Sequence, residues 1–359
     1  MNNRELSRTA FWSPLIMLSA GHLLSDFYNN FLPPLLPVLT TNLGLSLTAS
    51  GLLVMVYSFT SSILQPLCGY YMDKINSAPL ILLTLPLSAL FIIFSAMVPN
   101  LTLLFIFVAI AGLASSIFHP LGSIMTGRLS SPANRGLALA IFIGGGNFGF
   151  ALSPLIVVFC LVKFGLNSLI YLAIPAIVLT LAYWAGGFHR FNTVATGRKA
   201  QQTAALTWHN TPNVLMLNMV MAFRSWSQVA IPTFLPLLLA SRGKPPELAA
   251  GLLTVFLMGG AAGGFIGGYL GDKLGHKKSI LLSLATCVPA LWFFLAGSQT
   301  SPTAWIMLGL AGAALQSTVP SSIVWAQKML PANAAQAKRQ AQHHSRGHGG
   351  VSRQHFLSP

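Results

Sequence analysis

Charge is scarce in this chain. Only 7% of its 359 residues are charged, and five Asp and Glu stand against 20 Lys and Arg. A soluble domain usually carries about 25% charged residues, because its surface must face water. With 54% hydrophobic residues, this deficit excludes a disordered chain and most soluble enzymes. The composition predicts an all-α polytopic membrane protein.

Cysteine is rare as well, and several catalytic motifs are missing. Cys68, Cys160 and Cys287 lie far apart in apolar stretches, without metal-ligand spacing. They exclude a disulfide-rich secreted domain and are expected to be packing residues. The sequence has no Gly-Lys-Ser/Thr phosphate loop and no Gly-x-Ser-x-Gly nucleophile motif. We therefore predict neither an enzyme nor a cofactor.

Ten stretches are apolar and long enough to cross a bilayer, which takes about 20 helical residues. The predicted spans are 12–39, 47–71, 78–98, 101–127, 136–162, 165–188, 212–240, 247–271, 276–297 and 302–326. The first span carries Asp26 and is followed by others, so we do not expect it to be a cleaved signal peptide.

The positive charges predict the orientation of these spans. With the N-terminus in the cytoplasm, the outer loops contain only Lys163, Arg242 and Lys244, and only Arg224 lies within a span. All other Lys and Arg fall on the cytoplasmic side, as the positive-inside rule requires. Because the cations follow the sides of the membrane, we do not expect nucleic-acid binding, despite a pI near 10.3.

The chain repeats itself. Segment 69–74 (GYYMDK) follows the second span, and 268–273 (GYLGDK) follows the eighth; 31–36 (FLPPLL) recurs as 234–239 (FLPLLL). Both members of each pair fall on the same side, so the repeat is parallel, as in two-bundle transporters. The predicted units are a six-helix bundle (1–188), a cytoplasmic loop (189–211), an incomplete four-helix bundle (212–326) and a basic tail (327–359).

The loop motifs at 69–74 and 268–278 resemble the cytoplasmic loop motif of the major facilitator superfamily. Four further segments resemble the fosmidomycin-resistance group of efflux proteins: 61–66 (SSILQP), 115–120 (SSIFHP), 145–149 (GGNFG) and 224–226 (RSW). The resemblance covers residues 10–333. It implies twelve spans, alternating access, and export of a small drug-like solute in exchange for protons. On that basis we expect a monomer in the bacterial inner membrane, whose partners are solute, protons and lipid.

Asp26 and Arg224 are the main functional candidates, because a charge inside a span is costly. Both lie roughly midway through a span, where two-bundle transporters bind their solutes. We hypothesise that they face a central cavity from opposite halves, with Asp26 carrying the coupling proton and Arg224 binding an anionic solute. The alternative is a fixed ion pair that only holds the halves together.

Further polar residues in the spans could assist this pair. His22 precedes Asp26 by one helical turn and could relay protons or orient the carboxylate. His119, Gln228, Asn147 and Gln316 are also predicted contributors. Each could instead be a packing residue or a hydrogen-bonding partner of a neighbouring helix.

The two loop motifs are predicted to gate the transporter. The resemblance favours a latch in which each aspartate accepts hydrogen bonds in one conformation only. The lysines would lie beside anionic lipid headgroups. The alternative is that each aspartate is an ordinary solvated loop charge. The residues concerned are Gly69, Asp73, Lys74, Gly268, Asp272, Lys273 and Lys277.

Glycine patterns predict close helix packing. Gly144-x-Gly146-x-x-Gly149 matches a dinucleotide fingerprint, but it lies inside a span without the strand that such a site needs. Gly260, Gly264 and Gly268 recur every four residues in the eighth span, which would allow another backbone to approach.

The sequence becomes polar where an eleventh span should begin. The segment after 331–333 contains Lys, Arg, Gln and His, and cannot cross a bilayer. We expect a frameshifted or prematurely ended chain without spans eleven and twelve; a metal-binding histidine tract is a disfavoured alternative. The alternatives to an exporter are therefore an inactive remnant, a non-transporting membrane scaffold, or an importer of a small metabolite.

Overall fold

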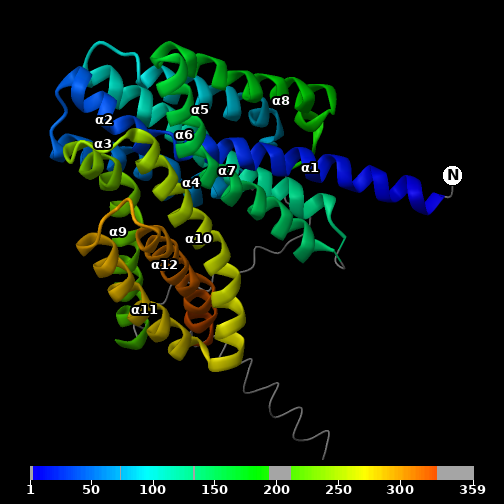
Figure 1. The fold of residues 1–359 in the computed structure, drawn as a ribbon. Helices are drawn as coiled ribbons and strands as arrows, with labels where there is room; N and C mark the ends of the chain where they lie inside the picture. The colour runs from blue at the N-terminus through cyan, green and yellow to red at the C-terminus, as the bar shows by residue number, and fades with distance from the viewer. Residues whose placement is uncertain (1–2, 73, 132–133, 194–211, 330–359) are drawn as a thin grey trace, which may run out of the picture.

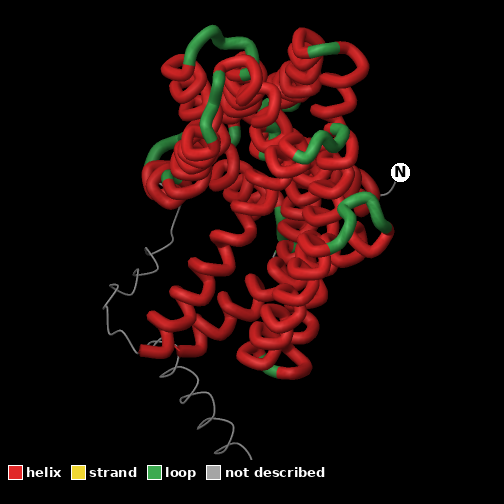
Figure 2. Tube along the Cα trace, turned by 60° about the vertical axis from the view of Figure 1, so that its left-hand side comes forward, coloured by secondary structure: helices red, strands yellow, loops and turns green. Residues whose placement is uncertain are grey.

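The computed structural model describes residues 3–72, 74–131, 134–193 and 212–329. The predictions on Asp73, on most of the loop between the halves and on the tail from residue 330 lie outside this part of the chain. Within the described ranges, every regular element is helical (Figure 2).

Two groups of helices form the molecule (Figure 1). The first group consists of α1 (Asn3–Asn29), α2 (Leu32–Leu43), α3 (Leu47–Ser58), η1 (Phe59–Ile63), α4 (Gln65–Met72), η2 (Ala78–Leu80), α5 (Ile81–Ser95), α6 (Leu101–Leu129), α7 (Arg135–Phe164), η3 (Leu166–Ala173), α8 (Ile174–Ala185) and η4 (Phe188–Arg190). The second group consists of α9 (Pro212–Ser241), α10 (Pro246–Leu274), α11 (His276–Ala296) and α12 (Pro302–Met329).

Eight helical segments of the described chain are long and apolar enough to cross a membrane. They correspond to predicted spans two to six and eight to ten. The predicted spans 12–39 and 212–240 are helical too, but they are not among the eight. These two spans carry Asp26 and Arg224, and such polar side chains lower the hydropathy of a helix.

Prolines interrupt the first two predicted spans. Span 12–39 is divided between α1 and α2, with Pro33 and Pro34 in the first turn of α2. Proline has no backbone N–H and cannot continue a helix without losing a hydrogen bond. At the break, the Asn30 side chain donates to the Phe150 carbonyl of α7 at 2.8 Å. The predicted span 12–39 is therefore built from two consecutive helices.

Span 47–71 is also divided, into α3, the π-helical turn η1 and α4. The turn lies just before Pro66, which removes one helical hydrogen bond. The Gln65 side chain donates to the Ser61 carbonyl at 2.8 Å and supplies a replacement donor. Gln65 thus bonds to the π-helical turn that precedes its own helix.

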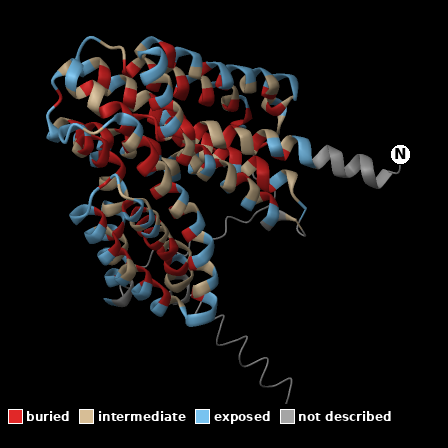
Figure 3. Cartoon of the chain, in the orientation of Figure 1, coloured by how far each residue is buried: buried red, intermediate tan, exposed pale blue. Residues whose placement is uncertain are grey.

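Each group of helices has its own buried core (Figure 3). Leu35, Ile92 and Phe118 belong to the first core, and Leu252 and Phe256 belong to the second. Large apolar side chains are exposed on the outside of both groups, as expected where the surrounding solvent is lipid.

The two groups pack together at one end and diverge at the other (Figure 1). Leu237 of α9 belongs to the first core, and Ala151 of α7 belongs to the second. An apolar cavity of about 210 Å³ lies at this junction, lined by residues of α2, α7, α9 and α10. The first residues of α7 and the last residues of α10 lie far apart in Figure 1. The two groups therefore form a V.

Glycines let α10 and α12 approach closely, but they are not the predicted ones. A Cβ on Gly263 would lie 2.1 Å from the Ala313 carbonyl oxygen, and one on Gly267 would lie 1.9 Å from that of Ser317. A Cβ on Gly264 would be 3.9 Å from its nearest neighbour, and one on Gly268 would meet nothing within 4 Å. Glycines occur here in adjacent pairs, so they form two rows along α10. The row that contacts α12 contains Gly263 and Gly267, each one residue before a predicted glycine.

Replacing Gly263 with alanine should destabilise the second group of helices. The new methyl group would overlap backbone atoms of α12, and overpacking of this kind costs about 1–3 kcal/mol. The neighbouring Gly264→Ala is the matched control, because its methyl group has room and alanine favours helix by up to about 1 kcal/mol. Thermal unfolding in detergent should show a lower midpoint for Gly263→Ala alone; equal midpoints would contradict the assigned packing.

Candidate functional site

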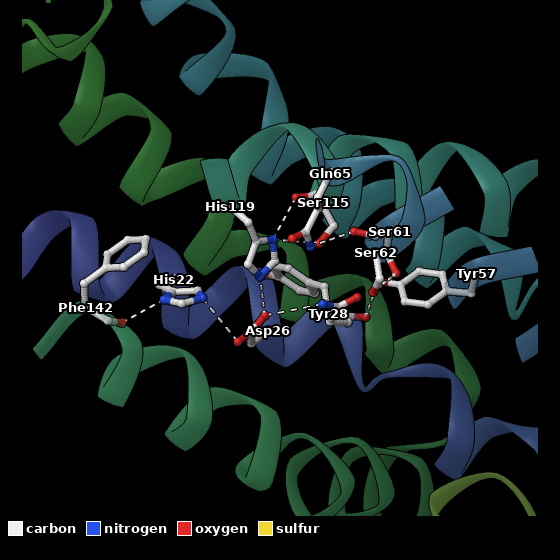
Figure 4. A network of polar contacts seen from close by, with 11 residues as sticks. His22, Asp26, Tyr28, Tyr57, Ser61, Ser62, Gln65, Ser115, His119 and Phe142 are labelled. Carbon is white, nitrogen blue, oxygen red and sulfur yellow. Dashed lines mark hydrogen bonds and ion pairs between the residues drawn. The ribbon is translucent and has the colours of Figure 1, made fainter. Parts of the chain in front are cut away.

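Asp26 lies between two histidines from different helices (Figure 4). Its Oδ1 is 2.8 Å from Nε2 of His119 on α6, and its Oδ2 is 3.4 Å from Nε2 of His22 on α1. The Asn29 amide donates to Oδ1 at 3.3 Å. The Asp26 side chain is 15% exposed, so the group is largely removed from solvent. We call His22, Asp26 and His119 the triad.

The second nitrogen of each histidine faces a backbone carbonyl. His22 Nδ1 is 2.7 Å from the Phe142 oxygen, and His119 Nδ1 is 2.8 Å from the Ser115 oxygen. A carbonyl oxygen can only accept a hydrogen bond, so both Nδ1 atoms carry hydrogen and donate. In the neutral rings, each Nε2 therefore presents its lone pair to Asp26.

This arrangement fixes how many protons the triad contains. A hydrogen bond needs a hydrogen between its two heavy atoms, and neither a carboxylate oxygen nor an Nε2 lone pair supplies one. The 2.8 Å contact between His119 and Asp26 therefore requires one proton beyond two neutral rings and a carboxylate. The geometry of the triad therefore accommodates one additional proton.

Helix α7 closes one side of the triad. The Phe142 ring stacks on the His22 ring with centroids 4.2 Å apart. A Cβ on Gly146 would lie 2.5 Å from Asp26 Oδ2, and one on Gly149 would lie 1.9 Å from the Leu23 carbonyl oxygen. The predicted close packing of this glycine run is confirmed at Gly146 and Gly149, whereas a Cβ on Gly144 would meet nothing within 4 Å.

Gly146→Ala should therefore disturb the triad itself. The added methyl group would push on Asp26 and on the His22 ring, at a cost of about 1–3 kcal/mol. We expect a lower midpoint of thermal unfolding in detergent for Gly146→Ala, because the added methyl group destabilises the packing of α7 against α1. Gly144→Ala, one half-turn away with open space, is the control and should retain the parent midpoint. Equal midpoints for both variants would contradict the contact.

Arg224 is buried in the other group of helices, with 8% of its surface exposed. Its Nε donates to the Leu315 carbonyl at 2.9 Å, and its guanidinium also donates to the side chain of Gln316 on α12. Both acceptors are neutral, and no acidic side chain of the described chain pairs with it. A buried guanidinium without a counter-ion is costly, so this position is suited to receive an anion.

The structure does not pair Asp26 with Arg224. Each is hydrogen-bonded within its own group of helices, and no ion pair joins the two in the described residues. The sequence alternative of a fixed ion pair between the halves is therefore wrong for this conformation. The two histidines occupy the place beside Asp26 that the fixed-ion-pair alternative gave to Arg224.

The other predicted polar residues lie near one of these two groups. Gln316 accepts from Arg224, as described above. Gln228 lies one turn beyond Arg224 on α9, and its Oε1 is buried without a hydrogen-bond partner among the described residues. Asn147 is half-buried and follows Gly146 on α7. Gln228 and Gln316 thus belong with Arg224, while Asn147 is next to the helix contact at the triad.

The two predicted gating motifs lie at the ends of α4 and α10. Lys74 donates to the Tyr70 hydroxyl at 2.6 Å, and Lys273 lies 5.9 Å from the centroid of the Tyr269 ring. Asp272 and Lys277 are exposed. Gly69 faces Pro120 of α6, where a Cβ would make an ordinary contact at 3.7 Å. Among the described residues, Asp272 forms no ion pair in this conformation.

Some parts of the site were missed from the sequence. The Asn29 amide, the Phe142 ring, and the carbonyls of Phe142 and Ser115 all contact the triad. Asn29 could have been found, because it lies three residues after Asp26 and so shares its helical face. No sequence signal marks the two carbonyls, since every residue has one.

The fold and the site define a class: a membrane carrier built of two helical bundles, with charged side chains buried in both. The family model for the Major Facilitator Superfamily matches residues 18–337. The chain therefore belongs to this superfamily and is a multi-pass transporter of the bacterial type.

Two relatives agree with this assignment. The chain is 30% identical to an uncharacterized MFS-type transporter, YfnC, of Bacillus subtilis over 90% of its own length and 80% of the relative's. It is 28% identical to the fosmidomycin resistance protein of Escherichia coli over 52% of its length and 47% of that protein's.

The similar structures support the fold alone, because their identities are low. An inward-facing, unoccupied bacterial homolog of the human lysosomal transporter Spinster superposes with a TM-score of 0.71 at 16% identity, covering 89% of this chain and 74% of that one. The nucleoside transporter NupG gives 0.73 at 14% identity, covering 89% and 84%. The inward-open Escherichia coli xylose transporter XylE gives 0.65 at 16%, covering 92% and 85%.

Proposed function

We propose that this chain exports a small solute across the bacterial inner membrane in exchange for protons. The observation that most directly supports this proposal is the triad. Its His119–Asp26 contact requires a bound proton within a predicted span. The proton gradient would supply the driving force, and no cofactor is needed. Because the triad draws on α1 and α6, a movement between these helices would change its proton affinity.

Alternating access is supported by the V-shaped arrangement of the two helix groups (Figure 1). If the N-terminus lies in the cytoplasm, as the loop charges predict, the described conformation is open to the cytoplasm. Two of the similar structures are themselves described as inward-facing or inward-open. Export would then begin with solute entering from the cytoplasm, followed by closure of this side and opening of the other.

The solute we favour is small, drug-like and anionic. Arg224 offers a buried positive charge whose described partners are all neutral, and Gln228 offers an unused acceptor one turn away. Together they suit an anion that also carries a hydrogen-bond donor. The name of the Escherichia coli relative makes fosmidomycin the first probe to try.

Gating by the two loop motifs is part of the proposal. The exposed position of Asp272 leaves its carboxylate available for a partner in another conformation. Lys74 and Lys273 lie over tyrosines of their own motifs at the predicted inner face, where anionic headgroups would attract them.

The test is solute-driven proton movement in vesicles. The full chain is reconstituted into liposomes that contain a pH-sensitive dye, and fosmidomycin is added on one side. Exchange predicts proton movement opposite to the solute, and it should vanish with a protonophore. Movement in the same direction would indicate an importer, and no movement with any of a panel of small anions would indicate a non-transporting remnant or scaffold; either result would overturn the proposal.

A further inference from the structure

The triad has the donor set of a transition-metal site. His22, Asp26 and His119 each offer one ligand atom, a ring nitrogen or a carboxylate oxygen, and these three atoms lie within 4.8 Å of one another. In a tetrahedral zinc site with bonds of about 2.0–2.1 Å, neighbouring ligand atoms are about 3.3 Å apart. His119 Nε2 lies 2.8 Å from Oδ1 of Asp26, and His22 Nε2 lies 3.4 Å from Oδ2, so each histidine nitrogen is near that spacing from one carboxylate oxygen.

The hydrogen bonds of the two Nδ1 atoms also favour metal binding. A metal-binding histidine usually donates its other ring N–H to a carbonyl or carboxylate, which fixes the tautomer and aims the free lone pair. The Phe142 and Ser115 carbonyls do this for His22 and His119. The two rings are nearly perpendicular, at 85°, with centroids 5.0 Å apart, so their lone pairs approach Asp26 from different directions.

The charge of the triad also suits a divalent cation. Two neutral imidazoles and one carboxylate carry a net charge of −1, and no other acidic side chain of the described chain contacts them. Arg224, the buried cation of the second half, is engaged with Leu315 and Gln316 and does not neutralise Asp26. A divalent ion would leave a net charge of +1 and one coordination position for water or an anion.

We propose that His22, Asp26 and His119 bind a divalent transition-metal ion of the Zn²⁺ class. Imidazole nitrogens with a single carboxylate favour Zn²⁺, Co²⁺ and Ni²⁺ over Mg²⁺ and Ca²⁺, which prefer oxygen ligands. The metal uses the same lone pairs as the proton in the His119–Asp26 contact. A bound metal therefore excludes that proton and inhibits coupled transport; this inhibition, unlike the binding itself, rests on the proposed function.

Binding is tested with Co²⁺ as the probe, on the full chain in detergent and without any gradient. Co²⁺ bound by three protein ligands gives visible absorption bands that the hexahydrated ion lacks. Histidines of the tail could also bind metal, so the parent for the experiment carries His343→Gln, His344→Gln, His348→Gln and His355→Gln. We expect this parent to bind one Co²⁺ with those bands, and Zn²⁺ to displace it.

Variants of the ligands then locate the site. His119→Gln should weaken Co²⁺ binding by more than the roughly 10–100-fold that outer-shell changes cost. His189→Gln, a histidine of η4 outside the triad, is the matched control and should bind as the parent does. Size-exclusion profiles establish that each variant is folded.

Two results would overturn the inference: a parent with no Co²⁺ bands, which would place any binding by the native chain on the tail histidines, or an affinity unchanged in His119→Gln. In neither case is the transport proposal affected, because solute-driven proton movement is measured separately. If Co²⁺ binds as expected but solute moves no protons, the metal site stands and the proposed function fails.

Discussion

An Asp26→Asn carrier is expected to lose proton coupling while remaining folded. Asparagine has nearly the shape of aspartate, and its amide can donate to an Nε2 lone pair without any added proton. The variant therefore imitates the proton-loaded triad permanently. Because no proton needs to bind or leave at this position, movement of solute is no longer accompanied by a proton moving in the opposite direction.

The size of this effect follows from the gradient. One pH unit corresponds to about 1.36 kcal/mol, so exchange of one proton per solute sustains about a tenfold concentration ratio of solute. With an imposed difference of about one pH unit across vesicles, the parent should approach that ratio for fosmidomycin and Asp26→Asn should remain near unity. Radiolabelled solute measured at steady state gives both values.

The matched control neutralises an acid outside the site. Glu247 is exposed in the first turn of α10, so Glu247→Gln removes one negative charge without touching the triad. It should accumulate solute as the parent does. Coupled accumulation by Asp26→Asn at the parent level would remove Asp26 from the mechanism.

Arg224→Gln is expected to weaken solute binding strongly without removing proton binding at the triad. Hydrogen bonds to a charged group contribute about 1.5–3 kcal/mol, which corresponds to a roughly 10–150-fold higher KM for an anionic solute. Arg224→Lys should recover only part of this loss, because lysine keeps the charge but lacks the planar fork of donors. Initial rates over a range of fosmidomycin concentrations give the KM values.

Arg242 provides the control for this series. It also donates to a glutamine, Gln299, but at the exposed end of α9 and at 3.1 Å. Arg242→Gln removes the same charge and the same kind of hydrogen bond outside the site, so KM should not change. If Arg242→Gln raised KM as much as Arg224→Gln, general electrostatics would explain the effect. If neither did, the anion site would be wrong.

The candidate residues could be found from the sequence because charge is so rare in the spans. Asp26 and Arg224 stand out in apolar stretches, and His22 shares a helical face with Asp26, so the sequence alone selects them. It could not decide what they contact. His119 enters the triad from α6, 93 residues away, and the meeting depends on how α1 and α6 pack.

Packing also decided which glycines of α10 allow α12 to approach closely. The sequence shows glycine pairs on α10, but neighbouring positions differ by about 100° around a helix, so only a known partner surface distinguishes Gly263 from Gly264. In the same way, Pro33 and Pro34 lie in the first turn of α2, directly after the interruption of span 12–39. The interruption at Asn30 is stabilised by a carbonyl of α7, which no local pattern contains.

The sequence by itself determined that this protein crosses a membrane as two related helical halves, because apolar length, loop charge and repeated motifs are local quantities. The tertiary structure alone decided that His119 joins Asp26 and His22, and that Arg224 bonds to Gln316. Buried charges associate with the partners that packing brings within a few ångströms, because desolvation favours an immediate hydrogen bond over attraction to a distant opposite charge.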